Sequence, residues 1–345
     1  MQANSKIHRL TLMLAATSAL QACAGQAAAN VEQRLTDADK FANCSIYDSH
    51  AHLISDNLEK YPRNPLPAFR PSADSPFKAG TNGQPGGMHG PNPVNEKPTA
   101  EQLYGWMAEE GVCGIAAIQK GMIYQTDNRY IIDAAKLFPN RMKAVIIIDP
   151  DEAGTLDKIR DAAKNGAVGI RFFGVGVKDK AAWLSSPASE QVWKLADELG
   201  LVVTIEGPAA GRDKLITVVT AMADKFPNLP IVLDHVFFPD VTQPNFGIGA
   251  NYEPLTARKN ISVKFTALNM DVIREQGLAP EQVLRRAVDV FGPDRVMWGS
   301  DIGTSSGTFK EMVERAKASA ALLNEAERRK YLRNVGERIF AAKRS

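Results

Sequence analysis

Hydrophobic and polar positions alternate along this chain with two different periods. Short runs rich in β-branched residues are separated by longer stretches in which apolar residues recur every three to four positions. The first pattern is typical of buried strands, and the second of helices that cover a sheet. Runs of the first kind predict eight strands, at 45–52, 113–119, 142–149, 167–173, 201–206, 231–235, 261–266 and 295–299.

Amphipathic stretches between these runs predict helices, among them 99–110, 129–136, 153–165, 189–199, 213–225, 280–290 and 311–323. Regular alternation of strand and helix indicates the α/β class with a parallel sheet. Eight strands with intervening helices predict a (β/α)8 TIM barrel. An open doubly wound sheet is the alternative, but the even spacing and the scarcity of Gly-rich phosphate loops argue against it.

Two segments interrupt this regular pattern. The stretch 56–98 is rich in Pro, Gly and Asn and falls between the first strand and its helix. Loops of this length inside a compact domain usually serve function, so we expect a βα lid over the mouth of the barrel. His89 lies in its Gly-rich part and is expected to be a solvated loop residue. The segment near 240–258 is irregular and, with the lid, should shape the pocket.

Composition excludes several classes of partner. The chain has 345 residues, of which 44% are hydrophobic and 23% charged, as in an ordinary globular protein. The formal net charge is +2, and residues 1–22 carry two basic residues and no acid, so the chain without them has a net charge of zero. We therefore expect a small-molecule substrate, with neither nucleic acid nor an anionic membrane surface as a partner. Oligomeric state does not follow from the sequence.

The first 22 residues have the pattern of a signal peptide. Two basic residues precede a short apolar run at 10–20, which is too short to span a bilayer. The sequence 20–23 resembles a bacterial lipobox and makes Cys23 a candidate for lipidation. Small residues up to position 29 offer ordinary cleavage instead. Either route predicts an exported protein, in the periplasm or anchored by lipid at a bacterial membrane.

Cys44 and Cys113 remain after either kind of processing. Each lies at the start of a predicted strand, and the two strands are neighbours if the barrel is correct. A Cys44–Cys113 disulfide is a reasonable hypothesis in an oxidising compartment. Two buried free thiols are the alternative.

Candidate chemistry begins with two histidines at the end of the first strand. His50 and His52 are two residues apart, so they project from the same face of a strand. Such a pair suits metal binding or proton transfer. The alternative is two structural histidines with hydrogen-bond partners.

Other predicted strands also end in polar residues, and the carboxyl ends of barrel strands meet around one mouth. These residues are Arg171, Glu206, Asp234, His235 and Asp301. So many polar side chains at one rim predict an active site there. Lys264 lies within the seventh strand, where the period of two does not tell which face it takes, and a structural role is favoured for it.

These motifs resemble the amidohydrolase superfamily, in its amidohydrolase-2 branch. The matching segments span about residues 44–341 and are 46–52, 169–172, 231–235, 262–265, 298–301 and 332–340. Within the branch the chain is most similar to 2-pyrone-4,6-dicarboxylate lactonases and sugar lactonases. Arg171 stands where many members carry a carbamylated Lys, which argues against a binuclear metal centre. Glu206 stands where metal-dependent members carry His.

The resemblance implies hydrolysis of a lactone without a required cofactor. Asp301 would be the general base, with its pKa raised by desolvation and by Glu206. His235, with His50 or His52, would stabilise the oxyanion. Arg171 would hold a substrate carboxylate. Glu206 would orient the histidines.

Two other functions remain open. One zinc ion bound by His50, His52, Glu206 and Asp301 would make the protein a mononuclear hydrolase or decarboxylase of an aromatic-derived acid. An exported solute-binding barrel that has lost turnover is the second alternative, since a fold does not guarantee activity.

Overall fold

The computed structural model describes residues 37–65, 94–207 and 211–340. Residues 1–44 and 45–345 are two separate units, and residues 37–40 of the first are helical. In the second unit, eight parallel strands pair in the order of the sequence. They are β1 (Ile46–Ala51), β2 (Val112–Ile118), β3 (Met142–Ile148), β4 (Gly169–Phe172), β5 (Val202–Ile205), β6 (Ile231–Leu233), β7 (Ile261–Thr266) and β8 (Val296–Gly299).

The sheet closes on itself just beyond β8, where the chain pairs with β1. The amide of Asp301 donates to the carbonyl of His50 at 2.7 Å, and the amide of His52 donates to Ile302 at 3.1 Å. Ala51 and Ile302 form a parallel bridge at the same place. The predicted (β/α)8 barrel is therefore confirmed, because an open sheet would leave β1 and β8 apart.

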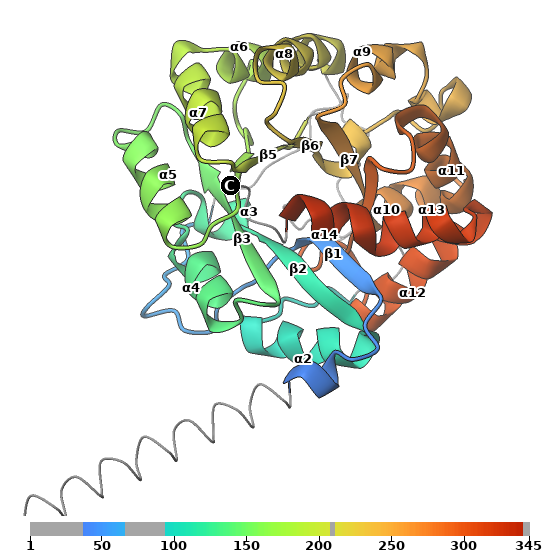
Figure 1. Cartoon of the computed structure of the whole chain (residues 1–345), viewed down its shortest axis with the longest axis horizontal. Helices are drawn as coiled ribbons and strands as arrows, with labels where there is room; N and C mark the ends of the chain where they lie inside the picture. The colour runs from blue at the N-terminus through green and yellow to red at the C-terminus, as the bar shows by residue number, and fades with distance from the viewer. Residues whose placement is uncertain (1–36, 66–93, 208–210, 341–345) are drawn as a thin grey trace, which may run out of the picture. The chain divides into compact units, whose positions relative to one another are not determined.

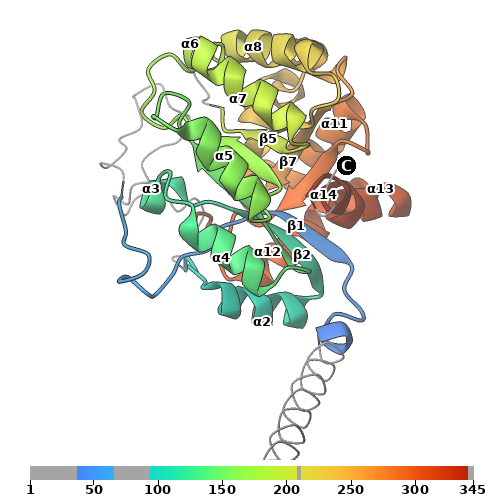
Figure 2. The ribbon, with the colours of Figure 1, turned by 60° about the vertical axis from the view of Figure 1, so that its left-hand side comes forward.

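Helices surround the strands, as Figures 1 and 2 show. The longer ones are α2 (Ala100–Glu110), α4 (Arg129–Leu137), α5 (Thr155–Lys164), α7 (Pro187–Glu198), α8 (Arg212–Lys225), α10 (Ala267–Glu275), α11 (Pro280–Phe291), α12 (Phe309–Ser319) and α14 (Val335–Phe340). The shorter ones are α3 (Gly121–Tyr124), α6 (Lys180–Leu184), α9 (Glu253–Thr256) and α13 (Glu325–Arg329). Among the described residues, no helix is both long and apolar enough to cross a bilayer.

Local sequence explains where several of these helices begin. Thr99 and Gln102 form a capping box at the start of α2, and Thr308 and Glu311 form another at α12. In each, two side chains satisfy backbone N–H groups that have no partner within the helix. Pro280 opens α11, at a position where its missing N–H costs nothing. The seven helices predicted from the sequence begin within two residues of the observed ones.

The C-terminal segment contributes to the barrel core. Val335, Ile339 and Phe340 of α14 are buried in one cluster with Tyr47 of β1 and Met297 of β8. Burial of aliphatic and aromatic side chains at this end stabilises the barrel through the hydrophobic effect. The segment that the sequence singled out at 332–340 therefore helps to close the barrel.

Parts of the predicted lid and of the targeting segment lie outside the described residues. Residues 56–65 and 94–98 of the predicted lid are described, and Asn95 forms a bridge with Gly307 after β8. His89, Cys23 and the predicted signal peptide are not among the described residues. The irregular segment near 240–258 holds two 3-10 turns, Pro244–Gly247 and Ala250–Tyr252, before α9. Cys44 and Cys113 are both disulfide-bonded, and their pairing with each other stays a prediction.

Candidate active site

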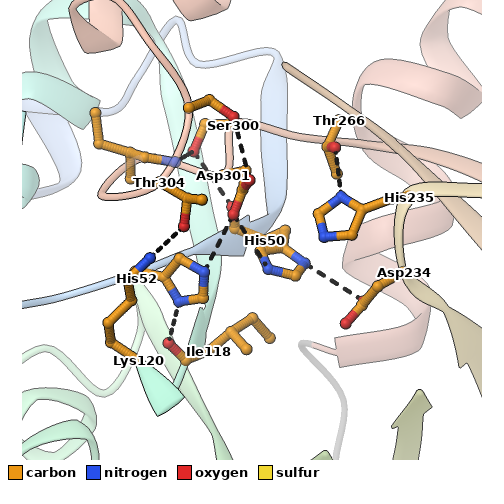
Figure 3. Close-up of polar contacts among 12 residues, drawn as sticks. His50, His52, Ile118, Lys120, Asp234, His235, Thr266, Ser300, Asp301 and Thr304 are labelled. Atoms are coloured by element: carbon orange, nitrogen blue, oxygen red, sulfur yellow. Dashed lines mark hydrogen bonds and ion pairs between the residues drawn. The ribbon is translucent and has the colours of Figure 1, made fainter. Parts of the chain in front are cut away.

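Three imidazoles and one carboxylate meet at the carboxyl end of the barrel strands (Figure 3). Oδ1 of Asp301 lies 3.1 Å from Nε2 of His52 and 3.5 Å from Nε2 of His50. The ring of His235 lies 5.1 Å from that of His50, centroid to centroid. All four residues are buried. The fold therefore brings together the four residues that the sequence predicted to be catalytic.

Asp301 owes its position to an unusual backbone conformation. It follows β8 with a φ of 52°, in the left-handed region that Asp tolerates better than most residues. Its amide bonds to the carbonyl of His50, which fixes this turn against β1. The hydroxyl of Ser305 donates to Oδ2 at 3.1 Å, so Oδ1 is the oxygen that faces the histidines.

The predicted rise in the pKa of Asp301 is wrong. Burial does act to raise this pKa, but the side chains of His52, His235 and His50 beside the carboxylate act more strongly and lower it. The prediction considered Glu206 as the neighbour, whereas three histidines lie closer. Asp301 is therefore ionised at neutral pH.

A second carboxylate, which the sequence analysis did not identify as functional, joins the first and last strands of the barrel. Oδ1 of Asp48 accepts hydrogen bonds from the amides of His50 and Ser300, each at 2.9 Å. Asp48 is fully buried, and burial raises its pKa to about 6 although these hydrogen bonds lower it. Because one oxygen holds both β1 and the end of β8, it sets the positions of His50 and Asp301 relative to each other. Its signal in the sequence was an Asp inside an apolar strand.

His235 sits in a left-handed turn directly after β6. The four residues 235–238 all have positive φ, including the β-branched Val236 at 50°. Side chains from neighbouring elements bond to all four carbonyls of this turn. Asn269 donates to His235, Tyr252 to Val236, and Arg212 to both following carbonyls. These bonds offset the cost of the backbone conformation and present His235 to the site.

Asp234 is the centre of a buried charge network next to His50. Its Oδ2 lies 2.9 Å from Nε of Arg171, and its Oδ1 lies 2.9 Å from Nζ of Lys264 and 3.4 Å from Nδ1 of His50. Lys264 thus faces the barrel interior. Arg171 also lies 3.4 Å from Oε2 of Glu206. Arg171 therefore already has two carboxylate partners, one of them shared with Lys264, and its role as a substrate-binding residue stays a prediction.

Lys120 joins the site from the end of β2 and was missed in the sequence. Its Nζ donates to Oγ1 of Thr304, in the loop after Asp301 (Figure 3). Burial lowers the pKa of Lys120 to about 8, although Asp301 acts to raise it. The signal that could have revealed it was the polar pair Gln119-Lys120 directly after a seven-residue apolar strand.

The histidines are neutral at pH 7, because burial lowers their pKa values, that of His52 to about 4. Nδ1 of His52 lies 2.9 Å from the carbonyl of Ile118, which can only accept a hydrogen bond, so Nδ1 carries the proton. Nε2 therefore presents a lone pair to the carboxylate of Asp301. Two acceptors this close attract each other only through a shared proton or a cation.

A group of three side chains at this site could hold a divalent metal ion, because a cation is attracted by such lone pairs. His50, His235 and Asp301 each offer a ligand atom, all within 4.8 Å of one another. Nε2 of His50 is buried, and no atom of the described residues forms a hydrogen bond with it. Imidazole and carboxylate are the ligands that zinc uses in catalytic sites. The ligand set predicted from the sequence was His50, His52, Glu206 and Asp301. The observed group contains His235 but neither His52 nor Glu206, and Glu206 pairs with Arg171 instead.

Comparisons with known proteins agree with the barrel fold. The amidohydrolase family model, Amidohydro_2, matches residues 47–341. A search of curated proteins found no match. One similar structure is a probable 2-pyrone-4,6-dicarboxylic acid hydrolase from Acinetobacter baumannii with citric acid bound. It is 14% identical, with a TM-score of 0.62 over 86% of this chain and 100% of that one.

Two further solved structures share the fold. An amidohydrolase from Burkholderia multivorans with bound zinc is 17% identical, with a TM-score of 0.61 over 86% of this chain and 99% of that one. A 2,6-dihydroxybenzoate decarboxylase in complex with 2,6-dihydroxybenzoate is 14% identical, with a TM-score of 0.54 over 72% and 89%. At these identities the similarity shows the shared barrel fold alone. The family model covers most of the sequence, and the chain therefore belongs to the amidohydrolase family.

Proposed function

We propose that this protein hydrolyses the ester bond of a small acidic lactone, with Asp301 as the general base. The observation that carries the proposal is the buried carboxylate of Asp301, whose Oδ1 lies 3.1 Å from Nε2 of His52 and 3.5 Å from Nε2 of His50. Such a carboxylate can take a proton while a water oxygen attacks the lactone carbonyl carbon. The ring C–O bond then breaks, and the proton passes from Asp301 to the leaving alkoxide. The product is one hydroxy acid, so the atoms of lactone and water balance.

The histidines have a different part in this proposal from the one expected from the sequence. The neutral His52 carries its proton on Nδ1 and cannot donate from Nε2 to an oxyanion. Lys120 is the cationic donor on the same side of the site. A divalent metal ion held by His50, His235 and Asp301 would polarise the carbonyl and lower the pKa of a bound water.

The balance of buried charge supports an acidic substrate. Two cations, Arg171 and Lys264, are matched by two carboxylates, those of Asp234 and Glu206. Lys120, in contrast, donates to the neutral hydroxyl of Thr304. Among the described residues, no carboxylate lies within ion-pair distance of Lys120, and a buried ammonium in such surroundings favours an anionic ligand. The citric acid bound to the similar Acinetobacter protein supports the same substrate class.

A metal-dependent decarboxylase of an aromatic acid is the second candidate. The group His50, His235 and Asp301 and the similarity to a 2,6-dihydroxybenzoate decarboxylase favour it. The two reactions differ in their products, because decarboxylation releases CO2 and lactone hydrolysis releases acid. Metal content alone does not distinguish the two reactions, because the similar structure that holds zinc is named only as an amidohydrolase, without a stated reaction.

The test begins with elemental mass spectrometry of the purified mature protein. The protein is then incubated with lactones of dicarboxylic and sugar acids and, separately, with dihydroxybenzoates. Acid release that is abolished by Asp301→Asn, with an unchanged melting temperature, would support the proposal. Exposed Asp224→Asn is the control variant and should keep full turnover. CO2 release without lactone hydrolysis would move the assignment to the decarboxylase, and tight binding of a small acid without turnover would make it a binding protein.

Export is a separate proposal that rests on the sequence of residues 1–29. Labelling with a radioactive fatty acid would test the lipoprotein route. The label should appear in the wild type and be absent from Cys23→Ser. An unlabelled protein recovered from the periplasm would instead support ordinary cleavage, and a cytoplasmic protein that retains its first residues would contradict both.

A further inference from the structure

We propose that Thr266 and Asn269 are positioning residues that fix the tautomer of His235. In this tautomer the proton is on Nδ1, and Nε2 presents a lone pair to His50 and Asp301. The inference rests on the proposed function in one respect only, namely whether this lone pair binds a metal ion or accepts a proton. The tautomer itself follows from the hydrogen-bond chemistry of three side chains.

The first step is the orientation of the Asn269 amide, which two backbone groups determine. The amide of Thr266 donates to Oδ1 of Asn269 at 3.0 Å, and Nδ2 of Asn269 donates to the carbonyl of His235 at 2.9 Å. A flipped amide would place its NH2 against a backbone N–H and its oxygen against a carbonyl oxygen. Both contacts would then be repulsive, so only the observed orientation is compatible with the backbone.

The second step is the direction of the Thr266 hydroxyl. Its Oγ1 lies 3.2 Å from Oδ1 of Asn269, an atom that can only accept. The hydroxyl therefore donates its single proton to Asn269, and its lone pairs remain free to accept. Thr266 and Asn269 also form a capping box at the start of α10, so packing and helix geometry hold the pair in place.

The third step is the ring of His235. Its Nδ1 lies 2.7 Å from Oγ1 of Thr266, which is left as an acceptor, so Nδ1 must carry a proton. A neutral imidazole has only one N–H, and here Nδ1 holds it against Thr266. Nε2 is consequently unprotonated, and Figure 3 shows this nitrogen on the side of the ring that faces His50.

This arrangement has a chemical consequence for the site. A neutral His235 with its proton on Nδ1 cannot donate a hydrogen bond from Nε2 to an oxyanion, which was its role in the sequence prediction. It can instead ligate a metal ion or accept a proton. Outer hydrogen bonds of this kind commonly set both the tautomer and the orientation of histidine ligands.

The direct test is long-range 1H–15N correlation NMR of the full protein labelled with 15N-histidine and stripped of metal with a chelator. The chain has five histidines, and His235→Gln identifies the signals of His235 by their loss. The proposal requires a protonated Nδ1 and an unprotonated Nε2 in the wild type. A proton on Nε2 of His235 in the wild type would overturn it, without bearing on whether the protein is a lactonase.

Two substitutions at Thr266 test the cause. Thr266→Val removes the acceptor and keeps the shape, and should shift His235 towards the Nε2–H form. Thr266→Ser keeps the hydroxyl and should retain the Nδ1–H form. Zinc titrated into the metal-free proteins by calorimetry should bind about 10- to 100-fold more weakly to Thr266→Val than to Thr266→Ser. If Thr266→Val keeps the Nδ1–H tautomer, the hydroxyl does not set it and the proposal is wrong.

Discussion

Nζ of Lys264 lies 2.9 Å from Oδ1 of Asp234, and both side chains are completely buried. This ion pair lies within the barrel, close to the ring of Phe340 from α14 and to Nδ1 of His50. It therefore connects the hydrophobic end of the barrel with the site. A buried pair of this kind adds little to stability over an apolar core, but loss of one partner leaves an uncompensated charge.

Lys264→Met should consequently lower the free energy of unfolding by about 3 kcal/mol. Asp234 would keep Arg171 as a partner, which limits the loss. Urea denaturation followed by circular dichroism measures the effect. Lys194→Met is a matched control, because Lys194 is 71% exposed and only 3.8 Å from Glu198, and it should leave the free energy of unfolding near that of the wild type. Equal stability of the two variants would refute a structural role for the buried pair.

Lys120→Met should weaken binding of an acidic lactone by about 10- to 100-fold, as expected for loss of a charged hydrogen bond. Neutral lactones should bind as before, because their contacts do not need the ammonium group. Calorimetry with 2-pyrone-4,6-dicarboxylate and with an uncharged pyrone gives both values. Lys158→Met removes the same charge from the surface, where Lys158 is 52% exposed, and serves as the control. Equal weakening for both ligands would show that Lys120 shapes the pocket and does not recognise charge.

Asp48 should make stability depend on pH between about 4 and 6. Its pKa in the folded protein is raised from 3.8 to about 6, so the folded state binds more protons than the unfolded state in this interval. The contribution of Asp48 to stability is therefore fully present below pH 4 and is lost as the pH rises through 6. This difference in pKa between the folded and unfolded states corresponds to about 3 kcal/mol.

Asp48→Asn isolates this effect, because the amide oxygen can still accept from His50 and Ser300 but does not titrate. Urea denaturation of both proteins from pH 4 to pH 7 should show the variant gaining stability relative to the wild type as the pH rises. A difference between the two proteins that stays constant across this range would contradict the raised pKa.

Gly299 should be intolerant of any side chain, because a Cβ there would lie 2.6 Å from Cβ of His50. Gly299→Ala would push β8 away from β1 and move His50 from Asp301, with a loss of about 2 kcal/mol and of most turnover. Gly105 in α2 is the matched control, since a Cβ there would meet nothing within 4 Å. Gly105→Ala should stabilise the protein by about 0.5–1 kcal/mol. Thermal melting and lactone hydrolysis of the two variants test this prediction. Full activity in Gly299→Ala would exclude the predicted clash.

The sequence predicted the barrel and the side chains at its mouth because both depend on local periodicity. All eight strands begin and end within two residues of their predicted bounds, since strand runs such as 142–149 are apolar on both faces. His50, His52, His235 and Asp301 meet because parallel strands place their carboxyl ends together. The resemblance to amidohydrolases, carried by the same strand-end motifs, indicated the family that the family model then showed.

Tertiary structure alone decided the electrostatics and the tautomers. The pKa of Asp301 falls because three histidines from two separate strands surround it, and no local pattern reports that distance. Lys120 and Asp48 act through Thr304 and Ser300, which are more than 180 residues away in the sequence. Periodicity specifies which face a residue takes, whereas charge balance and hydrogen-bond direction depend on which atoms of distant segments come within about 3 Å.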